Sequence, residues 1–378
     1  MKIAIDGIRF TSRPSGISNI TISIINALAQ NFKDADIYVF TNGALHPEVK
    51  ALLIDSEQIK ICSKPLRILP GIKLLWSFFN LNKLVSALKP DYFIAPNFVV
   101  HPFFLSANIK TILFIHDLVV VKYPQTMEWI NKVHIKSFLR SSLKRANLIW
   151  CNSAHTKQDL IWYYPKELIN KQVFIGAGVN PQFVCIAKKL KPEAIKAVIH
   201  QFSIKGKYMV FVGTLEPRKN LEFLIKLFKH IYQEYTLVIV GMSGWGNEAN
   251  RAFYLNKNSE AYKKIVFTQY ISNQELAAIY KNAEFYICTS IDEGLGLPLL
   301  EAMICGCPVI TAHNSAMVEV VEGAGVTVKG WEVNDWLNAI ADVIPNRERI
   351  VARSYERVQH YNWNKIIKDF VGSLDNLN

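Results

Sequence analysis

Short apolar runs alternate along the chain with longer segments whose apolar residues recur at helical spacing. Residues 92–95 and 110–115 are two such runs, and residues 17–28 show the helical spacing. Strands that are apolar on both faces are typical of parallel sheets covered by helices, because parallel strands need crossover connections. The alternation therefore predicts an α/β fold with doubly wound parallel sheets.

The same pattern predicts strands throughout the chain. They are residues 2–6, 37–40, 59–62, 92–95, 110–115, 148–151, 208–212, 236–240, 265–267, 285–288, a run that begins after Pro308, and 325–328. A chain of 378 residues is too long for one ordinary core, so we expect two domains of fewer than about 200 residues each. Half of the residues are hydrophobic, which is enough for two large cores.

Positive charge is concentrated in the first half. Residues 1–190 hold 23 lysines and arginines against 11 aspartates and glutamates, whereas residues 191–378 hold 20 of each. The net charge of +12 therefore comes entirely from the first half. A basic half favours an acidic partner, either nucleic acid, an anionic membrane surface or a phosphate-bearing substrate. No recognised nucleic-acid motif accompanies the charge, which disfavours nucleic acid.

The cysteines and the N-terminus bear on the compartment. Six cysteines lie singly in apolar segments, apart from Cys305 and Cys307, which predicts buried, reduced thiols in a cytosolic protein. A zinc site would need two pairs of closely spaced cysteines, and the chain has one. A strand follows Met1 directly, so no signal peptide is expected. No uncharged apolar run approaches the ~20 residues of a spanning helix.

The stretch from residue 285 to residue 311 carries the densest candidate chemistry. A strand leads into a glycine-bearing loop, Pro298 opens a helix, and the helix stops at Gly306. The amides of residues 299–301 are then expected to be free at a positive helix end, where phosphate is a natural ligand. Gly294 and Gly296 allow the backbone to approach a ligand closely.

Two glutamates lie on either side of this helix start. Glu293 precedes the helix and Glu301 is expected in its first turn, so both can face one cleft at the carboxyl end of the strand. Carboxylates beside a phosphate repel it unless they accept hydrogen bonds from sugar and ribose hydroxyls. Taken alone, these residues also fit an ordinary strand-to-helix turn with solvated glutamates.

The run EGLGLPLLEAMICGCPVI closely resembles the E-x7-E segment of the family-four retaining glycosyltransferases, which have the GT-B fold. The resemblance implies that Glu293 contacts the transferred sugar and that Glu301 contacts the nucleotide ribose. The further donor contacts that it implies in this run are Gly294, Leu295, Gly296, Leu297 and Pro298.

A second strand, glycine and helix start occur at residues 208–221, now with a basic turn. A guanidinium and an ammonium at a strand's carboxyl end suit a diphosphate, whose charge must be neutralised as it leaves. The run GTLEPRKN resembles the family's donor-phosphate segment, which implies donor contacts from Gly213, Thr214, Arg218 and Lys219. Thr214 stands where many relatives carry arginine, so Arg218 and Lys219 are expected to do more of the work.

His116 follows the expected strand 110–115. Ligands of open α/β sheets bind beyond the carboxyl ends of strands, although a lone histidine is more often structural. The segment His116-Asp117-Leu118 resembles a family segment whose histidine lies beside the transferred sugar. The resemblance therefore implies a catalytic set of His116, Glu293, Arg218 and Lys219.

The resemblance also implies contacts at two loops. Gly16 lies in the loop after the first strand, where the family's chain approaches the donor diphosphate and the acceptor. Relatives often have two adjacent glycines here, whereas this chain has Ser15 before Gly16. Tyr270 and Ile271 follow the strand at 265–267, where family members hold the base through backbone groups.

Two basic segments of the first half favour attachment to a membrane surface. Residues 64–90 interleave lysines and an arginine with leucine, tryptophan and phenylalanine, and residues 132–145 form a second basic segment that is predicted to be helical. Such side chains lie well in a membrane interface. The alternative is a helix whose apolar side faces the domain core and whose lysines are solvated.

The resemblance implies a retaining, metal-independent hexosyltransferase that needs no cofactor besides its donor, a GDP- or UDP-linked sugar. The acceptor would be a glycan or a lipid-linked glycan, as in mannosyl- or rhamnosyltransferases of bacterial surface polysaccharide assembly. We expect a cytoplasmic protein, peripheral on the inner face of the cell membrane. A non-catalytic sugar-nucleotide binding protein and a phosphorylase or epimerase of the same fold remain alternatives.

The expected domains are two Rossmann-like, doubly wound sheets that face a central cleft. Residues 1–188 form the acceptor domain, and a C-terminal helix at about 361–378 is expected to pack back on it. Residues 200–360 form the nucleotide-sugar domain, with residues 186–206 as a linker and lead-in.

Overall fold

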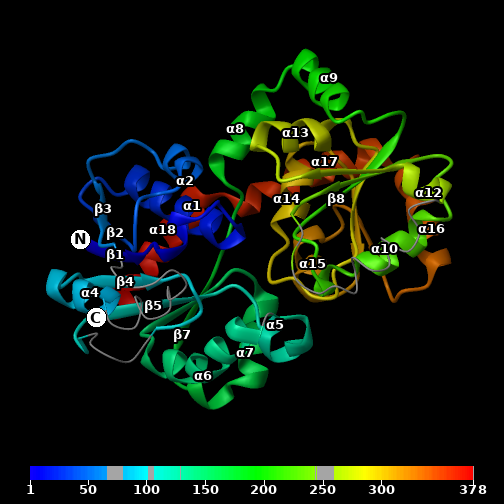
Figure 1. The fold of residues 1–378 in the computed structure, drawn as a ribbon. Helices are drawn as coiled ribbons and strands as arrows, with labels where there is room; N and C mark the ends of the chain where they lie inside the picture. Colours follow the sequence, from blue (N-terminus) through cyan, green and yellow to red (C-terminus); the bar gives the residue numbers. More distant parts are fainter. Residues whose placement is uncertain (66–79, 101–105, 128, 243, 245–258, 378) are drawn as a thin grey trace. The chain divides into compact units, whose positions relative to one another are not determined.

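The chain forms two sheets of parallel strands, each in a separate unit (Figure 1). The computed structural model describes residues 1–65, 80–100, 106–127, 129–242, 244 and 259–377. The first unit comprises Met1–Val121, Trp129–Asn180 and Asn362–Asn378, and the second comprises Lys122–Glu128 and Pro181–Tyr361.

The first unit contains a seven-stranded sheet with helices between its strands. Its strands are β1 (Lys2–Asp6), β2 (Asp36–Thr41), β3 (Ile59–Ser63), β4 (Tyr92–Ala95), β5 (Lys110–Ile115), β6 (Leu148–Cys151) and β7 (Gln172–Ile175). Its α-helices are α1 (Gly16–Asn31), α2 (Pro47–Leu52), α4 (Asn82–Leu88), α6 (Trp129–Arg145), α7 (Ala154–Tyr163) and α18 (Trp363–Leu374), and α5 (Val119–Lys122) ends at the boundary. Short 3-10 helices are η1 (Ile8–Thr11), η4 (Pro165–Glu167) and η7 (Asp375–Leu377).

The second unit contains a six-stranded sheet. Its strands are β8 (Tyr208–Val212), β9 (Thr236–Val240), β10 (Ile265–Gln269), β11 (Phe285–Cys288), β12 (Val309–Ala312) and β13 (Val326–Val328). Its α-helices are α8 (Pro181–Lys189), α9 (Pro192–Gln201), α10 (Leu221–Phe228), α12 (Glu260–Lys263), α13 (Asn273–Asn282), α14 (Leu297–Ile304), α15 (Ser315–Val321), α16 (Val333–Val343) and α17 (Arg347–Arg357). The 3-10 helices are η3 (Pro124–Thr126), η5 (Pro217–Lys219) and η6 (Val358–Tyr361).

Both sheets reverse their strand order at one place. The orders are β3-β2-β1-β4-β5-β6-β7 and β10-β9-β8-β11-β12-β13, and every described strand pair is parallel. The order reverses between β1 and β4 in the first unit and between β8 and β11 in the second. Connections on opposite sides of the reversal point part there, which leaves a crevice at the carboxyl ends of the strands where ligands of such folds bind.

Three inner strands of the second sheet are buried along their whole length. Every residue of β8, β9 and β11 is buried, as the uninterrupted apolar runs predict for parallel strands covered on both faces. The expected strands are confirmed throughout, and the structure extends some of them by a residue or two. The doubly wound α/β architecture is likewise confirmed.

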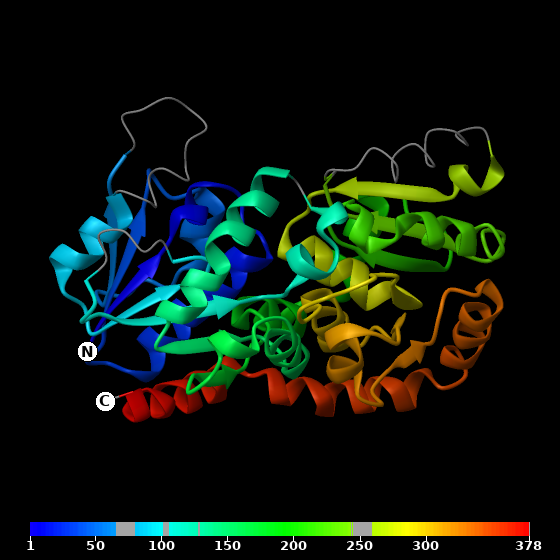
Figure 2. The ribbon, with the colours of Figure 1, turned by 90° about the horizontal axis from the view of Figure 1, so that it is seen from below.

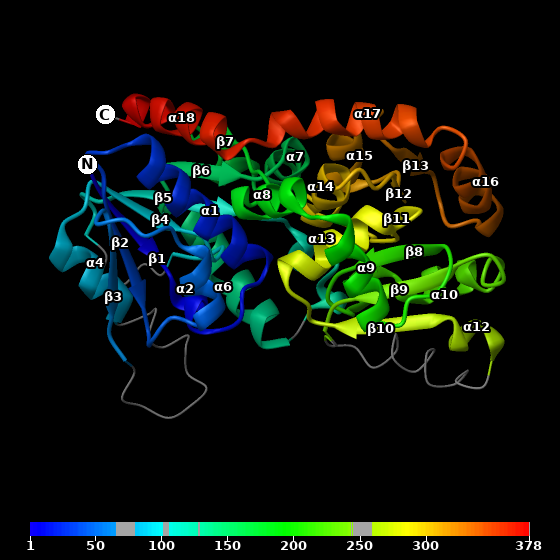
Figure 3. The ribbon, with the colours of Figure 1, turned by 90° about the horizontal axis from the view of Figure 1, so that it is seen from above.

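The last α-helix, α18, belongs to the first unit and lies beside its edge strand β7. It is the red helix next to the C-terminal label (Figures 2 and 3). Phe370 of α18 stacks on Trp150 of β6 with ring centroids 4.1 Å apart. Gln172 of β7 donates a hydrogen bond to the Ser373 carbonyl at 3.1 Å. An amphipathic helix is thereby stabilised by the aromatic core of a unit whose other residues lie far earlier in the sequence.

Some expectations differ in detail. The expected domain boundary at residue 188 lies inside α8, and the two units divide at Asn180. The expected linker 186–206 holds the end of α8 and the whole of α9, both part of the second unit. Of the expected membrane segment 64–90, residues 66–79 lie outside the described residues. No described helix has the length and apolarity that crossing a membrane requires.

The cysteines are all free, as expected. Cys151, Cys288, Cys305 and Cys307 are buried, but Cys185 is exposed on α8. The expectation that every cysteine is buried was therefore wrong, because the apolar residues around Cys185 occupy the opposite face of an amphipathic helix.

Candidate active site

A buried cluster of charges lies where the strand order of the second sheet reverses. Arg218 and Lys219 form the end of η5, which follows β8, and Glu293 lies in the loop after the adjacent strand β11. Lys219 Nζ lies 2.5 Å from Glu293 Oε1, and an Arg218 terminal nitrogen lies 2.8 Å from Glu293 Oε2. Two segments 74 residues apart in sequence thus meet at the crevice predicted for a ligand.

Glu293 is ionised in this cluster. Burial by itself would raise its pKa, but the positive charges of Arg218 and Lys219, with hydrogen bonds from Lys219 and Ser290, hold the pKa well below its usual range. The Ser290 hydroxyl donates to Glu293 Oε1 at 2.7 Å. The Glu293 carboxylate therefore forms ion pairs with both cations and also accepts the Ser290 hydrogen bond.

Arg218 is held from its other side as well. Glu216 Oε1 accepts from Arg218 Nε at 3.0 Å and from a terminal nitrogen at 2.6 Å, and the Asp292 carbonyl accepts at 2.5 Å. Glu216 is itself buried, so both carboxylates around this guanidinium lie inside the protein. A fork held by several acceptors keeps one orientation, which is what recognition of a diphosphate requires.

Two glycines make room for this arrangement. Gly213, which follows β8, has φ of +154°, and a Cβ added there would lie 3.0 Å from Lys219 Cε. A Cβ added at Gly241, which follows β9 with φ of +143°, would lie 2.0 Å from the Gly213 carbonyl oxygen. A glycine at position 213 therefore lets the Lys219 side chain pass close to the strand end.

The helix after the Glu293 loop starts earlier than expected. α14 begins at Leu297, so Pro298 is its second residue, and Gly296 caps it with φ of +82°. The Leu299 N–H donates to the Gly296 carbonyl at 2.9 Å, so the expectation that this amide is free was wrong. Glu301 lies one residue beyond the first turn, which corrects its expected position there.

Glu301 differs from Glu293 in its surroundings. It is intermediate in exposure, yet desolvation by the surrounding protein raises its pKa from 4.5 to about 7. No hydrogen bond or ion pair joins its carboxylate to another part of the described chain. A desolvated carboxylate without a hydrogen-bond partner is stabilised when a ligand hydroxyl donates to it.

The Glu293 loop is anchored by the start of α15. Ser315 Oγ accepts a hydrogen bond from the Glu293 N–H at 3.1 Å, and the Ala316 N–H donates to the Glu293 carbonyl at 3.2 Å. Sequence patterns did not identify Ser315, Ser290 or Glu216 as part of this cluster. The hydroxyls in the run TSIDE after β11 were the available signal for Ser290, because polar residues that directly follow a buried strand lie at its ligand end.

The remaining donor residues predicted in the second unit lie in loops that follow its strands. Thr214 is exposed after β8, and Tyr270 and Ile271 follow β10, the edge strand, with Tyr270 39% exposed. Gly294 and Leu295 are buried within the Glu293 loop. Ser272, directly after Ile271, caps α13 through a capping box with Glu275.

His116 lies at the end of β5 in the first unit and is buried. Its Nε2 lies 2.8 Å from the Pro96 carbonyl, and because a carbonyl only accepts, Nε2 carries the proton. Burial, with a smaller contribution from the Arg9 charge, lowers its pKa to about 3. His116 is therefore a neutral imidazole whose Nδ1 is an acceptor. Asp117 Oδ1 accepts from the Val119 N–H at 3.0 Å, so this aspartate caps the following turn.

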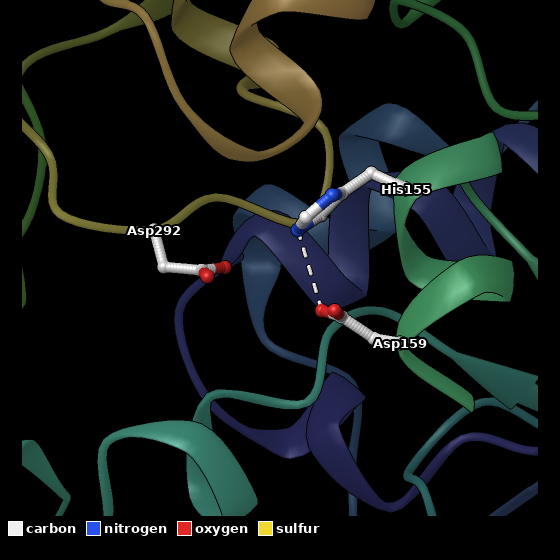
Figure 4. Close-up of side chains that lie close together, drawn as sticks. All are labelled: His155, Asp159 and Asp292. Atoms are coloured by element: carbon white, nitrogen blue, oxygen red, sulfur yellow. Dashed lines mark ion pairs between the residues drawn. The ribbon is translucent and has the colours of Figure 1, made fainter. Parts of the chain in front are cut away.

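Gly16 is the first residue of α1 in the first unit. Ser15 caps the helix by accepting from the Ser18 N–H, and no atom lies within 4 Å of a Cβ added at Gly16. The protein's own packing therefore does not require glycine here. On α7, also in the first unit, His155 Nε2 lies 3.3 Å from Asp159 Oδ2 (Figure 4). Sequence patterns did not single out this pair.

Two family models match the chain. "Glycosyltransferase Family 4" matches residues 14–183, and "Glycosyl transferases group 1" matches residues 194–359. The first match contains β2 to β7 of the first sheet, and the second contains all six strands of the second sheet. Between them they contain every residue of the charge cluster and His116.

Individual proteins are similar over most of the chain. The O-antigen chain mannosyltransferase B of Escherichia coli is 26% identical over 71% of this chain and 70% of its own length. The O-antigen chain mannosyltransferase RfbU of Salmonella typhimurium is 26% identical over 68% of this chain and 67% of its own. The crystal structure of Anabaena Alr3699/HepE in complex with UDP-glucose has a TM-score of 0.73 at 18% identity, covering 100% of both chains.

Proposed function

This chain is a family-four glycosyltransferase with the GT-B fold, and we propose from that premise that it is a retaining, metal-independent hexosyltransferase. The donor is a nucleotide-diphosphate sugar, and the acceptor is a hydroxyl of a glycan or lipid-linked glycan. The single observation that carries the proposal is the ion-pair cluster of Arg218, Lys219 and Glu293 at the reversal point of the second sheet.

The second unit would bind the donor through this cluster. Arg218 and Lys219 neutralise the departing diphosphate, and Glu293 keeps both cations at the strand end and positions the sugar. Glu301, which has no partner among the described residues, accepts from the ribose hydroxyls. Donor contacts by Gly16, Thr214, Tyr270, Ile271 and the 294–298 loop belong to the same proposal.

Chemistry at the sugar follows from these roles. The bond between the anomeric carbon and the diphosphate oxygen breaks, and the acceptor oxygen bonds to the same face of that carbon. The acceptor's proton passes to the departing phosphate, so the protein needs no general base. His116 is uncharged and contributes an acceptor, so in this scheme it binds a sugar hydroxyl and donates no proton.

The Arg218 guanidinium and the Lys219 ammonium supply the charge that a divalent metal would otherwise bring to the diphosphate. We therefore propose that transfer proceeds without metal and without any cofactor. Transfer in the presence of a chelator, at the rate seen with added magnesium, is the expected result; loss of activity restored by one metal would overturn this part.

The donor and the biological setting are proposed by similarity. Two of the similar proteins are O-antigen chain mannosyltransferases, so a GDP-linked mannose is the first donor to test. A UDP-linked sugar is the second, because a structural neighbour was solved with UDP-glucose. The expected setting is bacterial surface polysaccharide assembly.

Exposed apolar residues on α6 support peripheral attachment to an anionic membrane surface. Trp129, Ile130 and Val133 are 69%, 57% and 43% exposed at its start, and Lys136 and Arg140 are exposed farther along. We propose binding to the inner face of the cell membrane. Sedimentation with vesicles containing anionic lipid should fall for Trp129→Ser with Ile130→Ser, and equal binding of this variant and the wild type would exclude α6.

The function is tested with a panel of GDP-, UDP-, ADP- and dTDP-linked hexoses and an oligosaccharide acceptor. Transfer with an unchanged anomeric configuration, followed by NMR, is the expected result. An inverted product would refute retention. Isomerised donor would identify an epimerase, binding without turnover a non-catalytic protein, and phosphate-dependent cleavage with a pyridoxal absorbance band a phosphorylase.

A further inference from the structure

A second set of polar groups lies at the reversal point of the first sheet, which the proposed donor site does not use. Asp6 ends β1, Asn97 follows β4, and these two strands are adjacent where the strand order reverses (Figure 3). Arg9 lies in η1, three residues beyond Asp6. General topology places ligand sites of open α/β sheets at this edge.

The three residues form a chain of hydrogen bonds. Asn97 Nδ2 donates to Asp6 Oδ2 at 2.8 Å, and the Ile8 N–H donates to Asp6 Oδ1 at 3.0 Å. Asn97 Oδ1 accepts from Arg9 Nε at 2.7 Å. Because the buried Asp6 carboxylate can only accept, it sets the orientation of the Asn97 amide, and that amide in turn sets the direction of the guanidinium.

Arg9 itself is exposed, and within the described part of the chain it forms no ion pair. Among the described residues, no carboxylate lies within 4.0 Å of its guanidinium, and its only hydrogen bond uses Nε. A long exposed side chain normally keeps its rotamer freedom, so an exposed arginine held in one direction is unusual. The hydrogen bond from Arg9 Nε to Asn97 leaves the two terminal nitrogens of the guanidinium able to donate to a ligand. These two nitrogens match the spacing of two oxygens of a phosphate or carboxylate.

Asp6 and two histidines interact electrostatically with Arg9. Its charge contributes to lowering the pKa of His116 and, on α6, that of His134, although burial is the larger cause for both. Asp6 is the acid of this group, and its carboxylate oxygens are already occupied by the Asn97 amide and the Ile8 N–H. The first half of the chain also holds the whole net positive charge of the protein.

We propose that Arg9, positioned by Asn97 and Asp6, binds an oxyanion of the acceptor, either a phosphate ester or a sugar carboxylate. This inference rests on the proposed glycosyltransferase function, because only that function provides an acceptor. Arg9 then selects acceptors that carry a negative charge near the hydroxyl to be glycosylated. Asn97 is a positioning residue that does not touch the acceptor.

The first experiment measures transfer to three acceptors of one hexose: its phosphate ester, its uronic acid and its neutral methyl glycoside. Arg9→Gln should raise the KM of one of the two anionic acceptors about 10- to 100-fold, with little change for the neutral one or for the donor. Which acceptor responds identifies the oxyanion. Asn97→Ala should give a smaller rise for the same acceptor alone.

Arg13→Gln is the matched control. Arg13 lies in the same segment and loses the same charge, but it is 57% exposed and pairs loosely with Glu48 at 3.7 Å. Equal effects of Arg9→Gln and Arg13→Gln, or equal KM increases for charged and neutral acceptors, would overturn the inference. A raised donor KM would assign the oxyanion to the donor diphosphate and overturn it as well.

A binding measurement keeps the inference separate from the transferase function. Calorimetry with inorganic pyrophosphate, on protein saturated with nucleoside diphosphate, should show a site that Arg9→Gln removes and Arg13→Gln retains. If no nucleotide sugar supports transfer but this site remains, the proposed function fails and the oxyanion site stands. If Arg9→Gln fails to fold, Arg9→Lys serves instead, since lysine cannot bond Asn97 and offer a two-nitrogen edge; unchanged pyrophosphate affinity would then contradict the inference.

Discussion

Glu293 is the residue on which the charge cluster depends. Its two oxygens contact Lys219, Arg218 and Ser290, and Lys219 is 7% exposed. Because Arg218 also pairs with Glu216, Lys219 is the cation that would lose its partner if Glu293 were neutral. A buried unpaired ammonium is costly, whereas replacing both partners by uncharged groups removes that cost.

Glu293→Gln should therefore abolish transfer and lower the free energy of unfolding by about 3–5 kcal/mol. The double variant Glu293→Gln with Lys219→Met should regain most of that stability without regaining activity. Urea unfolding and donor-turnover assays measure both. Equal stability of the single and double variants would show that Lys219 is not the source of the loss.

The raised pKa of Glu301 makes the folded protein less stable as pH rises. Desolvation raises its pKa to about 7 from 4.5, so the folded protein binds an extra proton between those values. The free energy of unfolding therefore falls as pH rises from about 4.5 to 7, by on the order of 1–3 kcal/mol from this group. Nucleotide binding should in turn strengthen as Glu301 ionises.

Glu301→Gln should raise Tm relative to wild type at pH 8 and leave it nearly unchanged at pH 4.5, while weakening nucleotide binding. The control is Glu356→Gln on α17, which removes one exposed carboxylate and leaves the Glu301 site unchanged. Thermal unfolding across pH 4.5–8, with and without GDP or UDP, measures both effects. A Tm difference that does not vary with pH would contradict the raised pKa.

At the scale of elements, the strand ends of the second sheet approach too closely for side chains. The Gly241 position faces the Gly213 carbonyl, and both glycines have φ values that other residues rarely adopt. The backbone of the turn after β9 therefore packs directly against the backbone of the turn after β8, and Gly213 of that turn lies next to the Lys219 side chain. The sequence shows a glycine after each apolar run, but only the structure shows which backbone each glycine meets.

Gly241→Ala should lower Tm by more than about 5 °C, because the added methyl group overlaps a backbone carbonyl and the backbone must shift. Gly372→Ala is the matched control, since Gly372 lies inside α18 with no atom within 4 Å of the added Cβ. Alanine stabilises helix interiors by roughly 0.5–1 kcal/mol, so its Tm should rise slightly. Differential scanning fluorimetry separates the two; a harmless Gly241→Ala would refute the close approach.

At the scale of the whole molecule, each unit has its own sheet and core. Phe370 on the last helix contributes to the first unit by stacking on Trp150 and contacting Phe174 edge-on. The charge cluster, which is the main part of the proposed donor site, belongs to the second unit. The two units should therefore respond separately to mutation and to ligand.

Calorimetric unfolding tests this separation. Phe370→Ala should lower the transition of the first unit, at a cost of about 3–5 kcal/mol, and leave the other in place. Nucleoside diphosphate should raise only the transition of the second unit, because a ligand stabilises the state that binds it. A single transition that shifts with both changes would show that the units unfold as one.

The sequence alone determined the strands, their parallel class and the family. Strands buried on both faces appear as uninterrupted apolar runs whatever lies beside them, and the Glu293–Glu301 and Arg218–Lys219 motifs are local in sequence. Tertiary structure alone decided which strand ends are neighbours. It thereby decided the pairing of Lys219 with Glu293, the pKa values of Glu301 and His116, and the Asp6–Asn97–Arg9 chain. Those properties arise from burial and from contacts between segments far apart in sequence, which no local pattern records.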